Sequence, residues 1–245
     1  MIDVRHLTKQ FGQFAAVDDV SFSVARGETL VLLGTSGCGK TTTLRMLNRL
    51  IEPTGGTVTV DGVDVRQPPG PDLRRRMGYV IQDGGLFPHY TVAEAIATVP
   101  NLLGWEPTRI RERTAELMDK LQLPADMLRR YPAELSGGQQ QRVGLARALA
   151  VRPPVVLMDE PFGALDPFTR RHVRREVFGL NELRETTVVL VTHDVAEALE
   201  LADRIALMDR GRIVQIGPPD DLLSHPATDF VRDFLDNTPR RQGVL

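Results

Sequence analysis

The stretch Gly34-Thr35-Ser36-Gly37-Cys38-Gly39-Lys40-Thr41 matches the pattern G-x-x-x-x-G-K-[ST] and decides the fold. The apolar run Thr29 to Leu33 precedes it, and Thr42-Thr43-Leu44-Arg45-Met46-Leu47 follows it with helical character. A buried strand, a glycine-rich turn and a helix start are the context of a phosphate-binding loop (P-loop). Glycines let backbone N–H groups converge on an anion at the positive end of the helix dipole. The stretch therefore predicts nucleotide binding.

Individual residues of the P-loop have different expected tasks. Lys40 can reach the β- and γ-phosphates, and the Thr41 hydroxyl can ligate Mg²⁺. The alternative is an accidental match, which average residue usage makes about a one-in-a-hundred event in a chain of this length. The expected nucleotide-binding residues are Gly34, Thr35, Ser36, Gly37, Cys38, Gly39, Lys40, Thr41 and Thr42.

Composition limits the class of protein. The chain has 245 residues, which suits one domain or one domain with an inserted subdomain. Its single cysteine, Cys38, excludes an internal disulfide, and its formal net charge of −2 gives no electrostatic argument for nucleic-acid binding. The first residues do not form a signal peptide, and the longest apolar runs have the length of strands. We therefore expect a cytoplasmic protein that works at a membrane only through a partner.

Two aromatic residues lie before the P-loop in a β-rich part of the sequence. Short strands are predicted at Ile2–Val4 and Val20–Val24, with Phe11 and Phe14 between them. Phe11 can stack on adenine or pack in the core, and the residues alone leave both interpretations open. Phe14 is expected to pack in the core, so that its loss would affect stability.

The chain changes in character from strands to helices near residue 89. A hairpin is predicted around Asp61-Gly62, an exposed loop over Gln67–Pro71, and a strand over Gly78–Ile81 that ends in Gln82. From His89 to Ala148 helical patterns predominate. We therefore expect an inserted helical subdomain at residues 89–148, within a core formed by residues 1–88 and 149–245.

The insert contains one amphipathic helix and ends in a glycine-rich helix start. The helix is predicted at residues 108–121, with its apolar positions on one face. Its arginines are expected to be solvated: Arg109, Arg111 and Arg113. The insert ends in Leu135-Ser136-Gly137-Gly138-Gln139, directly before another helix. Ser136 suits an N-cap, and the alternative is a second phosphate-binding helix terminus.

Polar residues follow two buried strands in the last third of the chain. Asp159 and Glu160 end the apolar run Val155–Met158, where two carboxylates are costly unless they have a function. Asp159 can hold the Mg²⁺ shell, and Glu160 can polarise a water that attacks the γ-phosphate. Thr192-His193 end the next apolar strand, which makes His193 a second catalytic candidate. Three further acidic residues are expected to cap helices: Asp166, Asp194 and Glu197.

Taken in order, these motifs resemble those of the nucleotide-binding subunits of ABC transporters over essentially the whole chain. The matching segments are Walker A at Gly34–Thr41, the Q-loop at Gln82, the signature at Leu135–Gln139, Walker B at Val155–Asp159 with Glu160, the D-loop Ala164-Leu165-Asp166 and the switch His193. The resemblance implies an α/β P-loop NTPase (RecA-like) core with an antiparallel β lobe and a helical insert. It also implies ATP and Mg²⁺ as cofactors, and ATP hydrolysis.

The resemblance also implies how two subunits, identical or paralogous, use these residues. They would close head-to-tail over two ATP molecules, with the signature of one facing the P-loop of the other. Outside the P-loop, the residues implied at the nucleotide are Phe11, Ser136, Gly137, Gly138, Gln139 and Asp166. The implied catalytic residues are Glu160, His193 and Gln82, and the implied Mg²⁺ ligands are Thr41, Gln82 and, through water, Asp159. Members of this family often have tyrosine where this chain has Phe11.

A closer resemblance is to importers of osmoprotectants and other quaternary amines, such as glycine betaine, choline and carnitine. It rests on Met46–Pro53, on Gly78–Gln82 with Gly85–His89, and on His225–Ala227 with Asp229–Phe234. It implies a membrane permease and a substrate-binding protein as partners and a peripheral place on the inner face of the cell membrane. The Q-loop and the segment around Phe87-Pro88-His89 resemble the coupling face that receives a helix of the permease. The alternatives are an importer for another small solute and, disfavoured by length, an ABC ATPase outside transport. Glu160 and His193 argue against a regulator without turnover.

Overall fold

The structure is a computed structural model that describes residues 1–82, 85–163, 165–180, 183 and 185–236. It divides into two compact units, one of Met1–Val65 with Val189–Leu245 and one of Arg66–Val188. Residues 89–148, where the sequence predicts the insert, lie inside the second unit. Of the helices in the described part of the chain, none combines the length and the apolar character that crossing a bilayer requires.

The first unit contains an antiparallel sheet with the strand order β2-β1-β4-β5. Its strands are β1 (Ile2–Phe11), β2 (Phe14–Val24), β4 (Gly55–Val60) and β5 (Val63–Asp64). The hairpin predicted around Asp61-Gly62 is confirmed, because Val60 pairs with Val63 and the two turn residues have φ of 49° and 77°. Two left-handed residues form a turn that fits the twist of the strands, and Asp-Gly is favoured there.

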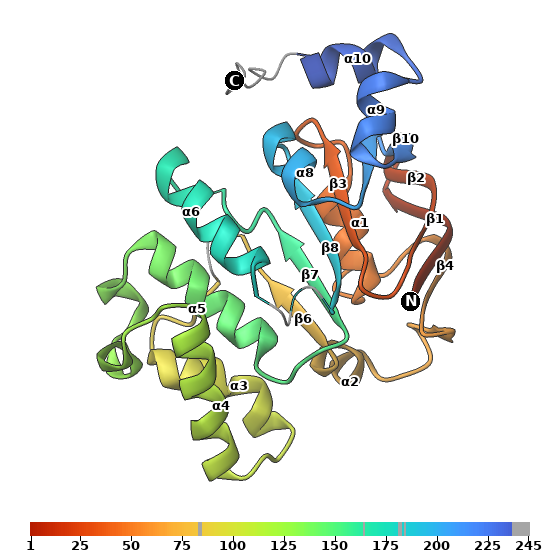
Figure 1. Cartoon of the computed structure of the whole chain (residues 1–245). Helices are drawn as coiled ribbons and strands as arrows, with labels where there is room; N and C mark the ends of the chain where they lie inside the picture. The colour runs from red at the N-terminus through yellow and green to blue at the C-terminus, as the bar shows by residue number, and fades with distance from the viewer. Residues whose placement is uncertain (83–84, 164, 181–182, 184, 237–245) are drawn as a thin grey trace. The chain divides into compact units, whose positions relative to one another are not determined.

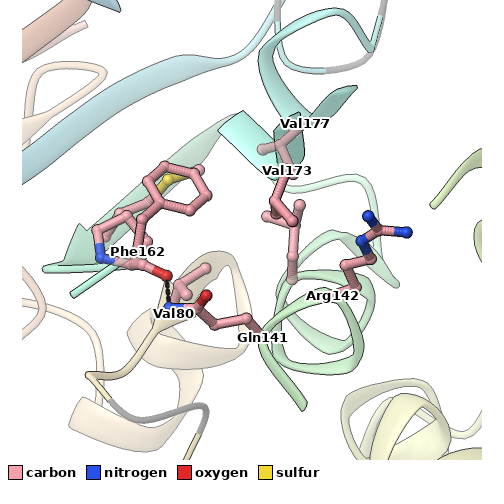
Figure 2. A pocket seen from close by; sticks show the side chains of 9 residues that line it. Val80, Gln141, Arg142, Phe162, Val173 and Val177 are labelled. Atoms are coloured by element: carbon pink, nitrogen blue, oxygen red, sulfur yellow. Dashed lines mark hydrogen bonds between the residues drawn. The ribbon is translucent and has the colours of Figure 1, made fainter. Parts of the chain in front are cut away.

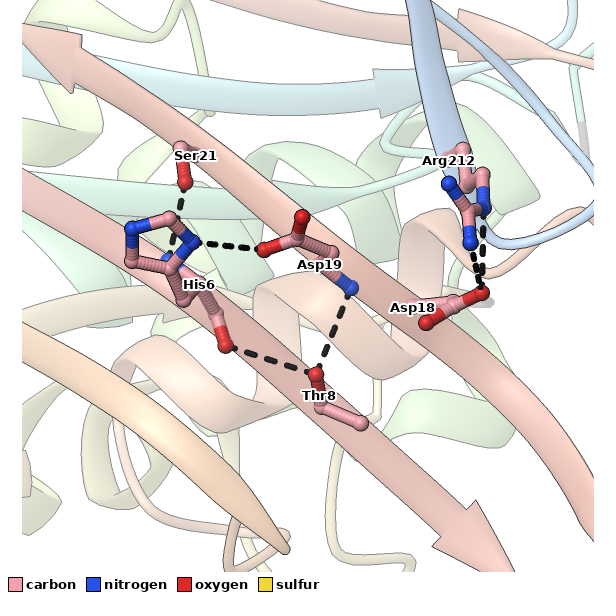
Figure 3. Close-up of polar contacts among 6 residues, drawn as sticks. All are labelled: His6, Thr8, Asp18, Asp19, Ser21 and Arg212. Atoms are coloured by element: carbon pink, nitrogen blue, oxygen red, sulfur yellow. Dashed lines mark hydrogen bonds and ion pairs between the residues drawn. The ribbon is translucent and has the colours of Figure 1, made fainter.

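β1 and β2 pair irregularly around His6 (Figure 3). The pairing shifts between Val4 and Leu7, and His6 has a left-handed φ of 50°. Its N–H donates to Ser21 Oγ at 2.8 Å, and its ring Nδ1 lies 2.7 Å from Asp19 Oδ1. These side chains therefore supply polar partners where the bulge interrupts the regular ladder of backbone hydrogen bonds.

A second group of strands in the first unit carries the P-loop. Here the strand order is β10-β9-β3-β8, of which β8 belongs to this unit from Val189 onward, and β3 pairs in parallel with β9. Every residue of β3 is buried, as is typical of a parallel strand covered on both faces. The elements are β3 (Thr29–Gly34), α1 (Lys40–Leu47), β8 (Thr187–Thr192), α8 (Val195–Leu201), β9 (Arg204–Asp209), β10 (Arg212–Gly217), α9 (Pro219–Ser224) and α10 (Asp229–Asp236).

The second unit combines two parallel strands with a group of helices (Figure 1). β6 and β7 pair from Met77 opposite Val155 to Val80 opposite Met158. α5 contacts α3, α4 and β6, so it lies at the centre of this unit. The helical character predicted from His89 onward is confirmed. The elements are α2 (Gly70–Arg75), β6 (Met77–Val80), α3 (Val92–Leu102), α4 (Pro107–Lys120), the 3₁₀ helices η1 (Ala125–Arg129) and η2 (Pro132–Glu134), α5 (Gly137–Leu149), β7 (Val155–Asp159) and α6 (Pro167–Phe178).

The prediction that all three arginines of α4 are solvated is wrong for Arg113. Arg109 and Arg111 are exposed as predicted, but Arg113 is only 5% exposed. Its guanidinium donates to the carbonyls of Leu149 at 2.8 Å and Ala150 at 3.1 Å, at the C-terminal end of α5. A buried cation is favoured there because it pairs with carbonyls that have no partner inside the helix and with the negative end of the helix dipole.

Glu116 completes this cluster beside α5. It pairs with Arg113 at 2.8 Å, with Lys120 at 2.6 Å and with Arg152 at 3.0 Å. Hydrogen bonds from Lys120 and Arg113 lower the pKa of the Glu116 carboxyl to about 2. A lowered pKa stabilises the folded state at pH values above the ordinary 4.5, and this stabilisation is lost as the pH falls toward 2.

Two further local predictions differ from the structure. The loop predicted over Gln67–Pro71 ends early, because α2 begins at Gly70. Pro71 lies in the first turn of α2, where its missing N–H breaks no hydrogen bond of the helix. Asp194 caps α8 as predicted, by accepting from the N–H of Glu197 at 3.1 Å. The second half of the predicted capping box is wrong, because Glu197 accepts instead from the Thr192 hydroxyl at 2.7 Å.

Candidate functional site

The P-loop connects the end of β3 to the start of α1, and two of its glycines are required by close packing. Gly34 has φ of 151°, and a Cβ there would lie 2.2 Å from the Met208 carbonyl oxygen. Gly39, the N-cap of α1, has φ of 106°, and a Cβ there would lie 2.4 Å from the Ala16 carbonyl oxygen. Both positions combine a left-handed backbone with backbone neighbours that cannot move aside. Any other residue would therefore displace the loop.

Backbone hydrogen bonds fix the loop from the β9–β10 turn. The N–H of Gly211 donates to the Cys38 carbonyl at 3.0 Å, and the Gly211 carbonyl accepts from the N–H of Asp18 at 2.8 Å. Arg212 then pairs with the Asp18 carboxylate at 2.6 Å (Figure 3). The loop is therefore held by β2 and by the β9–β10 turn, both of the first unit. Gly211 was not predicted from the sequence, although Arg210-Gly211, between the apolar runs 205–208 and 213–216, is a turn signal.

Lys40 begins α1 and is almost fully buried. Its Nζ donates to the carbonyls of Gly34 at 2.9 Å and Thr35 at 2.8 Å. Burial raises the pKa of the neighbouring Cys38 thiol, although the positive charge of Lys40 acts in the opposite direction. The thiol is therefore protonated and weakly nucleophilic.

The remaining P-loop residues divide by exposure. Thr35, Ser36 and Gly37 are exposed, which leaves this part of the backbone accessible to an anion. Thr41 and Thr42 are half-buried in the first turn of α1, where backbone N–H groups have no partner inside the helix. The loop therefore has the geometry expected of a phosphate site.

The two aromatic residues of the β1–β2 hairpin are both exposed. Phe11 ends β1 and is 51% exposed, and Phe14 begins β2 and is 64% exposed. The prediction that Phe14 packs in the core is therefore wrong, and the core alternative for Phe11 is excluded as well. Lys9 Nζ lies 5.0 Å from the centre of the Phe11 ring, a cation–π distance. Stacking of Phe11 on adenine stays a prediction.

Replacing Phe11 with alanine is expected to weaken ATP binding by about 1–3 kcal/mol, the value of a base stacked on an aromatic ring. Phe14→Ala is the matched control, because it removes an equally exposed ring from the same hairpin. Titration with a fluorescent ATP analogue measures both dissociation constants. Equal affinities for the wild type and for Phe11→Ala would show that adenine does not stack on Phe11.

His193 also belongs to the first unit. It directly follows β8, where Thr192 is buried and His193 itself is exposed. Asp194, the next residue, caps α8, so the backbone on both sides of His193 is held by regular structure. An exposed imidazole on a fixed backbone is suited to contact a ligand, and the catalytic role of His193 stays a prediction.

In the second unit, Gln82 and Glu160 lie together. The Gln82 amide nitrogen is 3.5 Å from Glu160 Oε2. Glu160 directly follows β7 and has a left-handed φ of 45°, which is uncommon for a residue with a side chain and is found at active sites. The preceding Asp159 is fully buried, and Tyr79 places its hydroxyl 3.5 Å from Asp159 Oδ2. Tyr79 was not predicted from the sequence, because nothing in the strand pattern indicates its partner.

Asp159 is suited to bind a metal ion together with a substrate phosphate, rather than as part of a metal site made of protein side chains alone. Among the described residues there is no group of three or more His, Cys, Asp or Glu side chains that could hold a metal. Mg²⁺ usually keeps several waters and binds through one or two carboxylates together with substrate phosphates. A single buried carboxylate at a strand end therefore fits Mg²⁺ bound with a nucleotide.

The signature segment, Leu135–Gln139, forms the start of α5. Ser136 Oγ accepts from the N–H of Gln139, and Gln139 Oε1 accepts from the N–H of Ser136 at 2.8 Å. The predicted N-cap is therefore confirmed as a complete capping box. A Cβ at Gly137 would meet nothing within 4 Å, so the surface beside this helix start is open. The N-terminal end of α5 is thus both capped and accessible to an anion.

Asp166 lies just before α6 and is exposed, and its carbonyl accepts from the N–H of Arg170 at 2.9 Å. Ala164, the first residue of the expected D-loop, lies outside the described residues. The P-loop, Phe11 and His193 thus belong to the first unit. Gln82, Asp159, Glu160, the signature segment and Asp166 belong to the second.

The chain has a phosphate-binding loop, a buried carboxylate after a parallel strand and a capped, accessible helix start. These features together are typical of a P-loop ATPase. A family model described as "ABC transporter" matches residues 17–163, and the chain belongs to this family of ATP-binding, ATP-hydrolysing cassettes.

Named relatives and a solved structure agree with this assignment. The chain is 53% identical over 235 residues to the glycine betaine uptake system ATP-binding protein YehX of Escherichia coli, covering 96% of this chain and 76% of that protein. It is 51% identical to the osmoprotectant import ATP-binding protein OsmV of Salmonella typhimurium, over 98% of this chain and 65% of that protein. The dimeric, ADP- and Pi-bound cassette MJ0796 shares 31% identity and a TM-score of 0.79, over 89% of this chain and 99% of that one.

Proposed function

We propose that the chain is the ATP-hydrolysing subunit of an importer for a quaternary-amine osmoprotectant of the glycine betaine, choline or carnitine type. The observation that carries this proposal is the 53% identity to a glycine betaine uptake ATP-binding protein over 96% of the chain. The chain spans only 65% of the second relative, so the activity of a complete transporter subunit is part of the proposal.

In the proposed mechanism, each residue at the nucleotide has one task. Lys40 releases its bonds to the loop carbonyls and binds the β- and γ-phosphates, and the P-loop N–H groups bind the remaining phosphate oxygens. Mg²⁺, held by Thr41, Gln82 and, through water, Asp159, would neutralise phosphate charge. Glu160 accepts the proton of the attacking water, and His193 contacts the γ-phosphate.

The second part of the proposal concerns assembly. Two copies of the chain, or one copy and a paralogue, close around ATP so that Ser136–Gln139 and Asp166 of one bind the nucleotide on the P-loop of the other. The capped, accessible start of α5 supports this, because a helix N-terminus attracts phosphate. Residues 89–148 act as the inserted helical subdomain, and residues 87–89 are part of the face by which the chain contacts a membrane permease. A substrate-binding protein delivers the solute, and the chain is peripheral on the inner face of the cell membrane.

Uptake measurements test the transport proposal. Deletion of the gene should abolish uptake of at least one of glycine betaine, choline and carnitine under osmotic stress, because import then lacks its energy source. A plasmid with the wild-type gene should restore uptake, and the same plasmid with Glu160→Gln should not. Normal uptake of all three solutes with loss of another would contradict the substrate assignment and leave the importer function in place. Normal uptake of every solute tested would contradict import.

A further inference from the structure

Gln141, in the second turn of α5, contacts the turn that follows Glu160. The Gln141 side chain is only 5% exposed, and its amide Nε2 donates to the carbonyl oxygen of Pro161 (Figure 2). Proline has no N–H, so this carbonyl is the only backbone hydrogen-bonding group of Pro161. Only a hydrogen-bond donor can pair with this carbonyl, so the Gln141 amide is oriented with its Nε2 toward Pro161.

The turn that begins at Glu160 needs such contacts. Glu160 has a left-handed φ of 45°, a conformation that costs free energy in a residue with a side chain. Strained residues of this kind persist when the surrounding structure holds them in place. Inside the turn, the N–H of Gly163 donates to the Glu160 carbonyl at 3.1 Å. The bond from Gln141 to Pro161 adds a contact from outside the turn, and it comes from the helix that begins at the signature segment.

The other end of the Gln141 amide is stabilised poorly. Among the described residues, no hydrogen-bond partner reaches its buried Oε1. A cavity of about 10 Å³ adjoins it, lined mainly by apolar side chains that include Val80, Phe162 and Val177 (Figure 2). This volume is at the lower limit for a single water. A buried acceptor without a partner destabilises a fold, and an apolar side chain of the same shape would avoid that cost. The amide is therefore poorly explained by stability alone.

We propose that Gln141 is a positioning residue for hydrolysis: it ties the signature helix α5 to the Glu160–Pro161 turn and so holds the Glu160 carboxylate in its active orientation. The inference rests on the proposed role of Glu160 as base. Because α5 begins at the signature segment, binding of that segment to a nucleotide also affects the position of the turn.

Gln141→Met tests this inference, because methionine keeps the length of the side chain and removes its donor. ATP turnover should fall about ten- to a hundredfold, the effect of misplacing a reacting group by about an ångström. The dissociation constant for ATP should stay unchanged. Gln67→Met is the matched control, since Gln67 is an exposed glutamine of the same unit, away from the turn and from the signature segment. It should hydrolyse ATP at the wild-type rate. Thermal unfolding of each variant is measured first, and Gln141→Asn, which shortens the amide, replaces the methionine variant if that variant does not fold.

A double-mutant cycle separates positioning from a merely structural role. If Gln141 acts through Glu160, Gln141→Met should lower single-turnover hydrolysis in the wild type but not further in Glu160→Gln. Equal fractional losses in both backgrounds, or unchanged turnover in Gln141→Met, would overturn the inference. Wild-type turnover in Glu160→Gln alone would contradict the proposed base instead, so the two failures are distinguishable.

Discussion

Replacing Glu160 with glutamine is expected to lower ATP turnover about 10²–10⁴-fold, which is the usual contribution of a general base. Glutamine keeps the shape of the side chain and its hydrogen bonding but cannot accept the proton of the attacking water. Binding of Mg-ATP should be retained, because the phosphate contacts come from the P-loop. Release of inorganic phosphate and equilibrium binding of ATP, measured on the same preparation, give the two quantities.

Glu185→Gln is the control for this substitution. Glu185 is exposed in the same unit, so the variant makes the same change in net charge away from the proposed site. It should hydrolyse ATP at the wild-type rate. Turnover in Glu160→Gln within a few-fold of the wild type would show that another group accepts the proton.

The second large effect is expected on assembly. The Glu160→Gln protein should accumulate as an ATP-bound dimer, because the γ-phosphate is not removed from between the P-loop of one chain and the signature segment of the other. Adding Ser136→Arg places a long side chain at the open start of α5, beside Gly137, and should return the protein to monomers. ATP should remain bound to the P-loop of each monomer. Light scattering after size-exclusion chromatography measures the mass, and a nucleotide assay measures occupancy.

Two controls separate blocking from unfolding. Ser136→Ala removes the N-cap, which typically costs about 1 kcal/mol, but adds no bulk, so it should weaken the dimer without abolishing it. Ala115→Arg adds the same side chain at an exposed position of α4 and should leave the dimer intact. A stable ATP dimer in the Ser136→Arg variant would mean that the signature segment does not lie at the interface.

Local patterns predicted the parts of the fold that local interactions determine. The Asp61-Gly62 turn and the Ser136 cap each depend on residues within a few positions, and the structure has both. The burial of Arg113, in contrast, could not be predicted from local patterns. Its burial depends on carbonyls of Leu149 and Ala150, more than thirty residues away, and no helical periodicity contains that information.

The predicted site residues show the same division. Asp159 and Glu160 could be selected because two carboxylates end an apolar run. Tyr79 beside Asp159 and Gln141 beside Pro161 could not, since both contacts join elements that are distant in the sequence. The sequence predicts Phe14 in the core because aromatic residues in strands are usually buried, but its position at a hairpin tip outweighs that tendency.

The most direct test of the proposed two-chain mechanism is ATP turnover in an equimolar mixture of Lys40→Ala and Ser136→Arg chains. Each variant alone should be inactive, because its dimer has two defective P-loops or two defective signature segments. In a mixed head-to-tail dimer, both defects fall on one nucleotide and the other nucleotide meets an intact P-loop and an intact signature. The mixture should therefore hydrolyse ATP well above the sum of the separate variants. Turnover equal to that sum would contradict the sharing of each ATP between two chains.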